Sequence, residues 1–89
     1  DDGPYLVGFA AETHDVVEQA KAKRQRKNAH VIVANRIGGE RSAFGADENT
    51  IAIITEHEVH EYGPASKDKL AEDIWRVVAE ARRHGEEAE

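Results

Sequence analysis

Residues 5–35 read YLVGFAAETHDVVEQAKAKRQRKNAHVIVAN, and this stretch decides the fold. Its ends, residues 5–10 and 30–35, are short apolar runs of the kind found in buried strands. Between them, residues 14–28 place acidic side chains first and basic side chains last, which is the order that a helix dipole favours. A strand, a helix and a second strand in succession predict a right-handed parallel crossover.

The predicted helix has a candidate capping residue at each end. Thr13 carries a hydroxyl that can accept a hydrogen bond from the first turn, so it is the expected N-cap. Asn28 tolerates the left-handed conformation in which many helices end. We therefore expect the helix to occupy residues 14–28, with Thr13 before it and Asn28 at its end.

The sequence after this unit predicts a loop, a hairpin and a helix. Residues 37–49 contain three glycines and show no period, so a long loop is expected there. Residues 50–55 and 59–62 are expected strands joined by a polar turn, with Gly63-Pro64 closing the hairpin. Ser66 is the expected cap of a final helix, with Gly85 beyond its end. The apolar face of that helix recurs at Leu70, Ile74, Val77 and Ala81.

The composition limits the class of protein. A length of 89 residues supports one small domain, and the absence of cysteine excludes disulfides and thiolate chemistry. A net charge of −6 argues against a general nucleic-acid binder. No apolar run is long enough to span a bilayer and no signal-peptide pattern is present, so we expect no membrane partner and a cytoplasmic location. The chain also lacks methionine, and we expect it to be a segment of a longer protein.

A basic cluster stands out against this acidic background, because residues 21–27 carry five positive charges. At about 100° per residue, Val16, Ala20, Lys23 and Lys27 fall on one stripe of the predicted helix. Two interpretations of the stripe remain open. The lysine stems could extend past the sheet edge and their charges complement the helix end. Alternatively, both ammonium groups could bind a shared anion such as a phosphate chain.

Phe9 also has two interpretations. An aromatic residue at the end of an apolar strand is more often part of a core than a ligand platform. The small neighbours Gly8, Ala10 and Ala11 would nevertheless let a ligand approach, and the ring could stack on a base. A helix would place Lys23 on the order of 15 Å from the helix start near Phe9, so a shared ligand would have to be extended.

Other polar residues are weaker candidates. His57 and His60 would point to opposite faces of a strand and lack a third metal ligand, which favours a solvated hairpin. Glu12, Asp47 and Glu48 could serve Mg²⁺ or act as acid and base, but scattered carboxylates in an acidic chain are usually surface groups. The sequence contains no dinucleotide fingerprint, P-loop or nucleophile elbow.

Together these residues resemble a known family. The shared features are Gly-Phe-Ala-Ala-Glu-Thr at residues 8–13, the spacing of Ala20, Lys23 and Lys27, the strand end Val33-Ala34-Asn35, and Phe44 followed by Asn49. They are similar to the C-terminal portion of phosphopantothenate cysteine ligase, the synthetase half of the bifunctional flavoprotein of coenzyme A biosynthesis. The resemblance extends over nearly the whole chain. It implies the β-α-β-β-β-α portion of a Rossmann-like three-layer α/β domain with a mixed sheet.

The resemblance also implies chemistry and partners. The family uses CTP and Mg²⁺ to convert 4'-phosphopantothenate to an acyl cytidylate and pyrophosphate, then couples cysteine to the acyl group. Carried over by position, Phe9, Lys23 and Lys27 would contact CTP, while no catalytic residue and no metal ligand is assigned. FMN belongs only to the fused decarboxylase domain, and a homodimer is expected. Residues 1–85 would be the C-terminal part of the ligase domain, and residues 86–89 a frayed acidic tail.

Some features depart from the family pattern. Arg36 and Ile37 stand where the family often has Asp and Val, and Ala43 replaces a glycine before the loop phenylalanine. Other nucleotide contacts of the family, including an alanine-rich strand and a lysine-bearing flap, have no counterpart in the chain. We therefore expect no turnover from these 89 residues alone. The alternative hypothesis is a stand-alone α/β module that binds a nucleotide or another subunit without catalysis.

Overall fold

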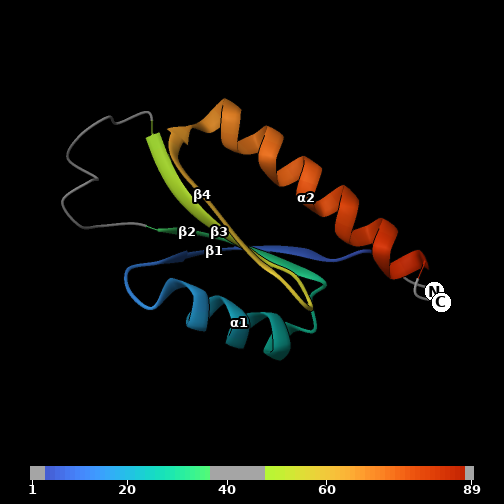
Figure 1. The fold of residues 1–89 in the computed structure, drawn as a ribbon. Helices are drawn as coiled ribbons and strands as arrows, with labels where there is room; N and C mark the ends of the chain where they lie inside the picture. Colours follow the sequence, from blue (N-terminus) through green and yellow to red (C-terminus); the bar gives the residue numbers. More distant parts are fainter. Residues whose placement is uncertain (1–3, 37–47, 88–89) are drawn as a thin grey trace.

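The computed structural model describes residues 4–36 and 48–87, and its elements follow the predicted β-α-β-β-β-α order. Two helices enclose a four-stranded sheet (Figure 1). The predicted loop, apart from its last two residues, lies outside the described residues. The elements are β1 (Val7–Glu12), α1 (Val16–Lys27), β2 (Val31–Arg36), β3 (Glu48–Ile54), β4 (Val59–Ser66) and α2 (Lys67–Glu87).

The sheet is mixed, with strand order β1-β2-β3-β4. β1 and β2 are parallel and in register from Val7 opposite Val31 to Glu12 opposite Arg36, which confirms that the crossover is parallel as predicted. β3 is antiparallel to β2 and to β4. The β3–β4 turn is closed by the Thr55 N–H, which donates to the carbonyl of Glu58 at 2.9 Å. Because β1 and β2 are parallel, their carboxyl ends lie together at one edge of the sheet.

The two faces of the sheet carry separate cores, because side chains alternate along each strand. On the α1 face, Val16 and Ala20 of the helix pack on Ile32, Ala34 and neighbouring strand residues. On the α2 face, the strand core consists of Val31, Val33, Ile51 and Ile53, and the helix contributes Leu70 and Val77, with Ile74 and Ala81 packed around them. The predicted apolar face of the last helix and the three-layer arrangement are therefore confirmed (Figure 1).

The prediction for the start of α1 is wrong, whereas the prediction for its end is confirmed. The helix begins at Val16 after Asp15, whose φ of 48° is left-handed and whose side chain makes no capping hydrogen bond. Thr13 instead lies 3.1 Å from the His14 ring, Oγ1 to Nδ1, so its hydroxyl does not cap the helix. Asn28 ends the helix with a φ of 55°, and its N–H bonds the carbonyls of Arg24 and Gln25.

The strand and helix boundaries differ from prediction near the glycines. β4 does not stop at Gly63 but continues to Ser66, because a register shift between Asn49 and Ile51 accommodates one extra residue in this edge strand. A Cβ at Gly63, where φ is 108°, would lie 2.4 Å from the Asn49 carbonyl oxygen. β3 accordingly starts at Glu48, earlier than the predicted residue 50.

The final helix begins as predicted and ends later. Ser66 Oγ accepts a hydrogen bond from the Lys69 N–H at 3.2 Å, which confirms the cap. α2 then continues through Gly85 to Glu87, so the expectation that Gly85 lies beyond the helix is wrong. Glycine lowers helix stability by only about 1 kcal/mol, which one long helix tolerates near its end.

Candidate functional site

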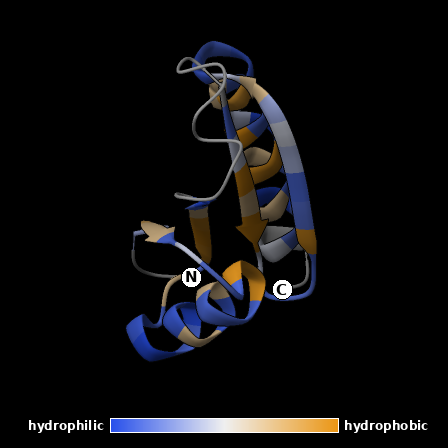
Figure 2. Ribbon diagram, turned by 90° about the vertical axis from the view of Figure 1, so that its left-hand side faces the viewer, coloured by the Kyte–Doolittle hydropathy of each residue, from blue (hydrophilic) through white to orange (hydrophobic). Residues whose placement is uncertain are grey.

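The basic stripe of α1 lies against the sheet at its start and carries its lysines further along. Val16 and Ala20 are buried, the Lys23 side chain is 28% exposed, and Lys27, the last helical residue, is exposed. Figure 2 shows α1 as mostly hydrophilic, in contrast to the apolar central strands. The helix therefore has little apolar surface with which to hold the sheet, and polar contacts contribute more to its placement.

Lys23 does not extend freely into solvent. Its Nζ lies 2.6 Å from Oε2 of Glu12, the last residue of β1. Glu12 is only 8% exposed, so the interpretation of this carboxylate as a surface group is wrong. The alternation of β1 explains why: Ala10 packs on the α1 face, and Glu12, two residues later, points to the same face. The ion pair thus brings the Lys23 ammonium to the carboxyl end of β1.

Lys27 differs from Lys23. Among the residues that the structure describes it has no carboxylate partner, and it lies in the last turn beside Arg24 and Arg26. The Arg24 guanidinium donates to the Ala29 carbonyl at 3.1 Å, so part of this cluster complements the helix end as one interpretation expected. The two lysines are one turn apart, on the order of 6 Å along the axis.

Phe9 lies on the other face of the sheet. Its register partner is Val33, which belongs to the α2-face core, whereas Lys23 comes from the helix on the opposite face. Phe9 is 68% exposed, so the interpretation of its ring as core is wrong for the described chain. The structure brings Lys23 and Glu12 together but does not place Phe9 beside them. A ligand that touches all three predicted residues would have to cross the outer edge of β1.

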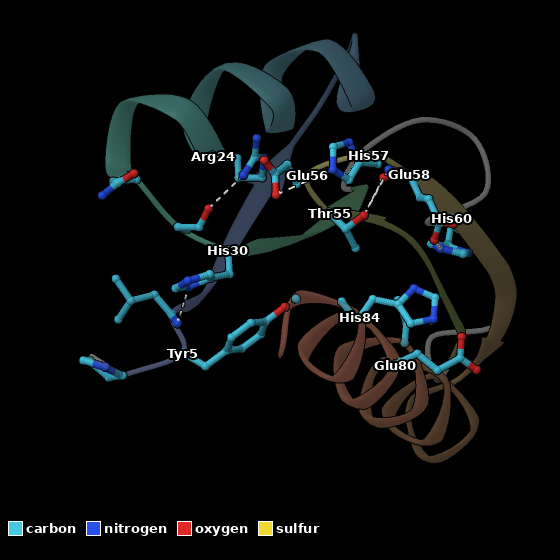
Figure 3. A pocket seen from close by; sticks show the side chains of 17 residues that line it. Tyr5, Arg24, His30, Thr55, Glu56, His57, Glu58, His60, Glu80 and His84 are labelled. Atoms are coloured by element: carbon cyan, nitrogen blue, oxygen red, sulfur yellow. Dashed lines mark hydrogen bonds and ion pairs between the residues drawn. The ribbon is translucent and has the colours of Figure 1, made fainter. Parts of the chain in front are cut away.

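A cavity of about 590 Å³, seen from close by in Figure 3, lies at the opposite end of the sheet. Both histidines of the predicted hairpin, His57 and His60, border it, together with His30 and His84. His60 Nε2 lies 2.9 Å from a Glu58 carboxylate oxygen. None of the three predicted nucleotide contacts lines this cavity, so it is separate from the lysine stripe.

An aromatic contact closes one wall of this cavity. Tyr5 stacks on His30 with ring centroids 4.4 Å apart, and His30 Nδ1 accepts a hydrogen bond from the Leu6 N–H at 2.9 Å. Burial raises the pKa of Tyr5, so the ring keeps its proton above the usual range. These contacts join the start of β1 to the start of β2 and give the wall a structural role.

A second buried carboxylate lies on the α2 face. Asp73 is 3% exposed, accepts a hydrogen bond from Lys69 Nζ at 2.9 Å, and lies 3.2 Å from Arg76 Nη1. The Lys69 hydrogen bond, followed by the weaker contribution of Arg76, lowers the pKa of Asp73. Arg76 also donates to the Tyr62 hydroxyl at 3.3 Å, and this contact raises the pKa of Arg76. The cluster ties α2 to β4.

Metal and membrane features can be assessed for the described residues. In residues 4–36 and 48–87, no group of three histidine or carboxylate residues could hold a metal ion. Asp47 lies outside this part of the chain, so its candidate role stays a prediction. No described helix is long and apolar enough to cross a membrane.

Sequence reasoning missed the pairing of Glu12 with Lys23, although signals for it were present. Every second residue of the strand, Gly8, Ala10 and Glu12, lies on one face. Lys23 lies on the helix stripe that packs on that face. Two cations lie near this position, Arg36 as the register partner of Glu12 on β2 and Lys23 on the facing helix, and the structure pairs Glu12 with Lys23. The pairing follows from combining the strand period with the helix period, which were considered separately.

The chain matches the family of DNA/pantothenate metabolism flavoprotein C-terminal domains over residues 1–81. The chain therefore belongs to this family, as the resemblance indicated. It is 39% identical over 77 residues to the coenzyme A biosynthesis bifunctional protein CoaBC of Haemophilus influenzae, which covers 86% of this chain and 19% of that protein. The CoaBC protein of Vibrio cholerae is 35% identical over 77 residues, with the same coverage of both chains.

A solved structure agrees with this assignment. The chain superimposes on the crystal structure of the C-terminal domain of a CoaBC protein with a TM-score of 0.67 at 33% identity, which covers 86% of this chain and 34% of that chain. The chain thus spans about a third of the solved domain and about a fifth of the curated relatives it matches.

Proposed function

We propose that this chain forms part of a CTP-dependent phosphopantothenate cysteine ligase and supplies its phosphate-binding lysines. The observation that carries the proposal is the pair Lys23 and Lys27 on one stripe of α1, in a member of a family whose relatives are named for coenzyme A biosynthesis. Lys23 reaches the carboxyl end of β1 through its ion pair. Ligands of open α/β sheets bind at that end of the strands.

The reaction proposed for the intact protein has two steps. The carboxylate of 4'-phosphopantothenate attacks the α-phosphorus of CTP and expels pyrophosphate, which leaves an acyl cytidylate. The amine of cysteine then attacks the acyl carbon and CMP departs. Neither step needs a covalent enzyme intermediate, so positioned cations and held substrates supply most of the acceleration.

The lysines suit the phosphate chain. Ammonium groups act as point charges that balance phosphate oxygens, and two of them one helical turn apart can contact successive groups of an extended triphosphate. Lys23 would contact the nucleotide near β1 and Lys27 further along the helix. Phe9 would reach the same nucleotide from the other side of β1, with its exposed ring available for stacking on the base.

Mg²⁺ would enter this site with the nucleotide. The described residues offer no protein cage for a cation, and Mg²⁺ is commonly held by substrate phosphates with few protein ligands. The other partners proposed are 4'-phosphopantothenate, cysteine and a second copy of the protein in a homodimer. We further propose a cytoplasmic location, with FMN confined to a fused decarboxylase domain, and no activity for this segment alone.

Replacing both stripe lysines in the intact protein tests the proposal. Lys23→Gln with Lys27→Gln should lower kcat/KM for CTP by about one to two orders of magnitude, which is roughly 1.4 kcal/mol for each factor of ten. Folding should lose about 1 kcal/mol for the helix-end charge, and up to about 3–5 kcal/mol more because Lys23→Gln leaves the buried Glu12 carboxylate without its cation. Steady-state kinetics with CTP varied, together with a thermal melt, separates the two effects.

A matched control uses two other cations of the same helix. Lys21 and Arg26 are exposed and lie off the stripe, so Lys21→Gln with Arg26→Gln removes the same charge without touching the proposed contacts. This control should keep kcat/KM for CTP within about twofold. If the stripe variant behaves like the control, the lysines do not bind CTP and the assignment is wrong.

A further inference from the structure

Glu12 has no assigned role, yet its carboxylate is buried on the α1 face of the sheet. It is 8% exposed and ends β1, with its side chain directed to the helix that follows. A buried carboxylate is retained only when a cation or hydrogen-bond donors compensate its lost hydration. Its cation comes from another element, the helix α1, rather than from its own strand.

The partner of Glu12 retains capacity for a second anion. An ammonium group has three N–H donors and Glu12 occupies one side of it, at 2.6 Å. The Lys23 side chain is still 28% exposed, so the pair with Glu12 does not enclose it and a ligand can approach it. Displacing Lys23 toward a ligand would strand a buried charge, so Lys23 should bind a ligand without leaving Glu12.

We propose that Glu12 is a positioning residue for nucleotide binding, which holds the Lys23 ammonium at the carboxyl end of β1 so that it meets the triphosphate without a loss of side-chain freedom on binding. This inference rests on the proposed function, in which Lys23 contacts CTP. A flexible lysine would otherwise have to be ordered by the ligand itself, which weakens binding. Lys27 has no carboxylate partner among the described residues and depends on no such support.

A double-mutant cycle tests the role in the intact protein. The variants are Glu12→Gln, Lys23→Met and their combination, and the ligands are CTP and inorganic triphosphate, titrated by calorimetry beside a thermal melt. Glu12→Gln should weaken binding of both ligands by about threefold to tenfold, and Lys23→Met by about tenfold or more. The combination should be no weaker than Lys23→Met alone, because Glu12 acts only through Lys23.

The control removes an exposed acidic residue of α1, the helix that carries Lys23. Glu18→Gln alters the net charge equally and should leave both dissociation constants within about twofold. A merely structural role for Glu12 would lower the melting temperature without coupling to Lys23 in ligand binding. Were Glu12→Gln to unfold, Glu12→Asp would replace it in the cycle, since it keeps the charge and withdraws the carboxylate by one methylene.

The possible failures are distinguishable. If Lys23→Met weakens CTP binding but Glu12→Gln does not, or if their losses add, the positioning role is overturned and the nucleotide assignment stands. A stronger affinity in Glu12→Gln would also overturn it, because Glu12 would then be a competitor for Lys23. If Lys23→Met binds both ligands as the wild type does, the CTP assignment of Lys23 fails and the positioning role fails with it.

Discussion

Within the part of the chain that the structure describes, each face of the sheet buries one carboxylate, and the contrast between them separates a contact that stabilises a helix from one that places a functional group. Asp73 on the α2 face takes both cations, Lys69 and Arg76, from its own helix, four residues before it and three after it. Glu12 on the α1 face takes its cation from a different element. A local pair forms wherever its helix forms, whereas a pair between elements fixes where one of them delivers a charge.

The helices differ in the same way. α2 presents a continuous apolar face and would pack on the sheet without its ion pairs. α1 buries only Val16 and Ala20, so the ion pair of Lys23 with Glu12 adds to a small apolar contact with the sheet. We infer that α2 completes the fold and that α1 is built to present its lysines.

The largest expected effect tests the apolar attachment of α2. Leu70 is 3% exposed, and Leu70→Ala should lower the free energy of unfolding by about 2–5 kcal/mol because it leaves a cavity between helix and sheet. CTP affinity of the folded protein should not change. Trp75 is 77% exposed on the same helix, so Trp75→Ala should stay within about 0.5 kcal/mol. Urea unfolding of both variants measures the difference, and equal losses would contradict the apolar attachment.

The next effect tests how closely the α1 face is packed. A Cβ at Gly8 would lie 2.8 Å from Ile32 Cδ1, and Ile32 is itself buried, so Gly8→Ala should cost about 1–3 kcal/mol. Gly85 on α2 has no neighbour within 4 Å of an added Cβ. Gly85→Ala should therefore raise stability by roughly 0.5–1 kcal/mol through helix propensity. Thermal melts that moved both variants in one direction would show that the two glycines are not distinguished by packing.

A smaller effect tests the local pair by pH. The pKa of Asp73 is lowered in the folded state, chiefly by the Lys69 hydrogen bond, so its contribution is present above the unfolded pKa and is lost as pH falls through the folded value. Lys69 and Arg76 are both more than half exposed, which limits that contribution by solvent screening. Asp73→Asn should thus be less stable at pH 7 and less sensitive to acid below about pH 4.

Melting temperatures of both proteins between neutral and acidic pH provide this test. The expected result is two curves that converge as the pH falls. Parallel curves would indicate that Asp73 contributes no linked stability. CTP affinity measured at neutral pH should be the same in both, in contrast to the Glu12 variants, because the Asp73 cluster lies on the other face of the sheet from the lysine stripe.

The periodic elements of this fold could be predicted from the sequence, since each depends on neighbours in the chain. Alternation and the helix period placed all four strands and both helices, and the apolar series from Leu70 to Ala81 identified the buried face of α2. The end of β4 was predicted wrongly because distant residues decide it, whereas the start of α1 and the end of α2 were predicted wrongly from local capping signals. The bulge of β4 lies at Gly63-Pro64, and no local signal in residues 59–62 shows that the strand continues beyond it.

The candidate site also has a part that the sequence could predict and a part that it could not. The stripe of Lys23 and Lys27 was predictable, because a single helix generates it. The burial of Glu12 and the exposure of Phe9 depend on which face of the sheet each helix covers. Phe9 and Glu12 differ by three positions in an alternating strand, so they had to point to opposite faces. What remained undetermined was which face would receive α1.

The smallest expected effect concerns the end of α1 that carries Lys27. Asn28 holds a φ of 55°, which costs a residue with a Cβ about 1 kcal/mol unless, like asparagine, it tolerates the left-handed region. Asn28→Ala should therefore lose about 1 kcal/mol, whereas Asn28→Gly should change stability by less than about 0.5 kcal/mol. If α1 presents its lysines, fraying of its last turn should weaken CTP binding through Lys27 by under about threefold and leave the Glu12–Lys23 coupling intact. Calorimetry of Asn28→Ala in the Lys27→Gln background isolates this effect, because no further loss is expected once Lys27 is gone. A loss that persisted there would mean that the helix end acts on binding without Lys27. The inference that α1 serves to present its lysines, whereas α2 completes the fold, would then be wrong.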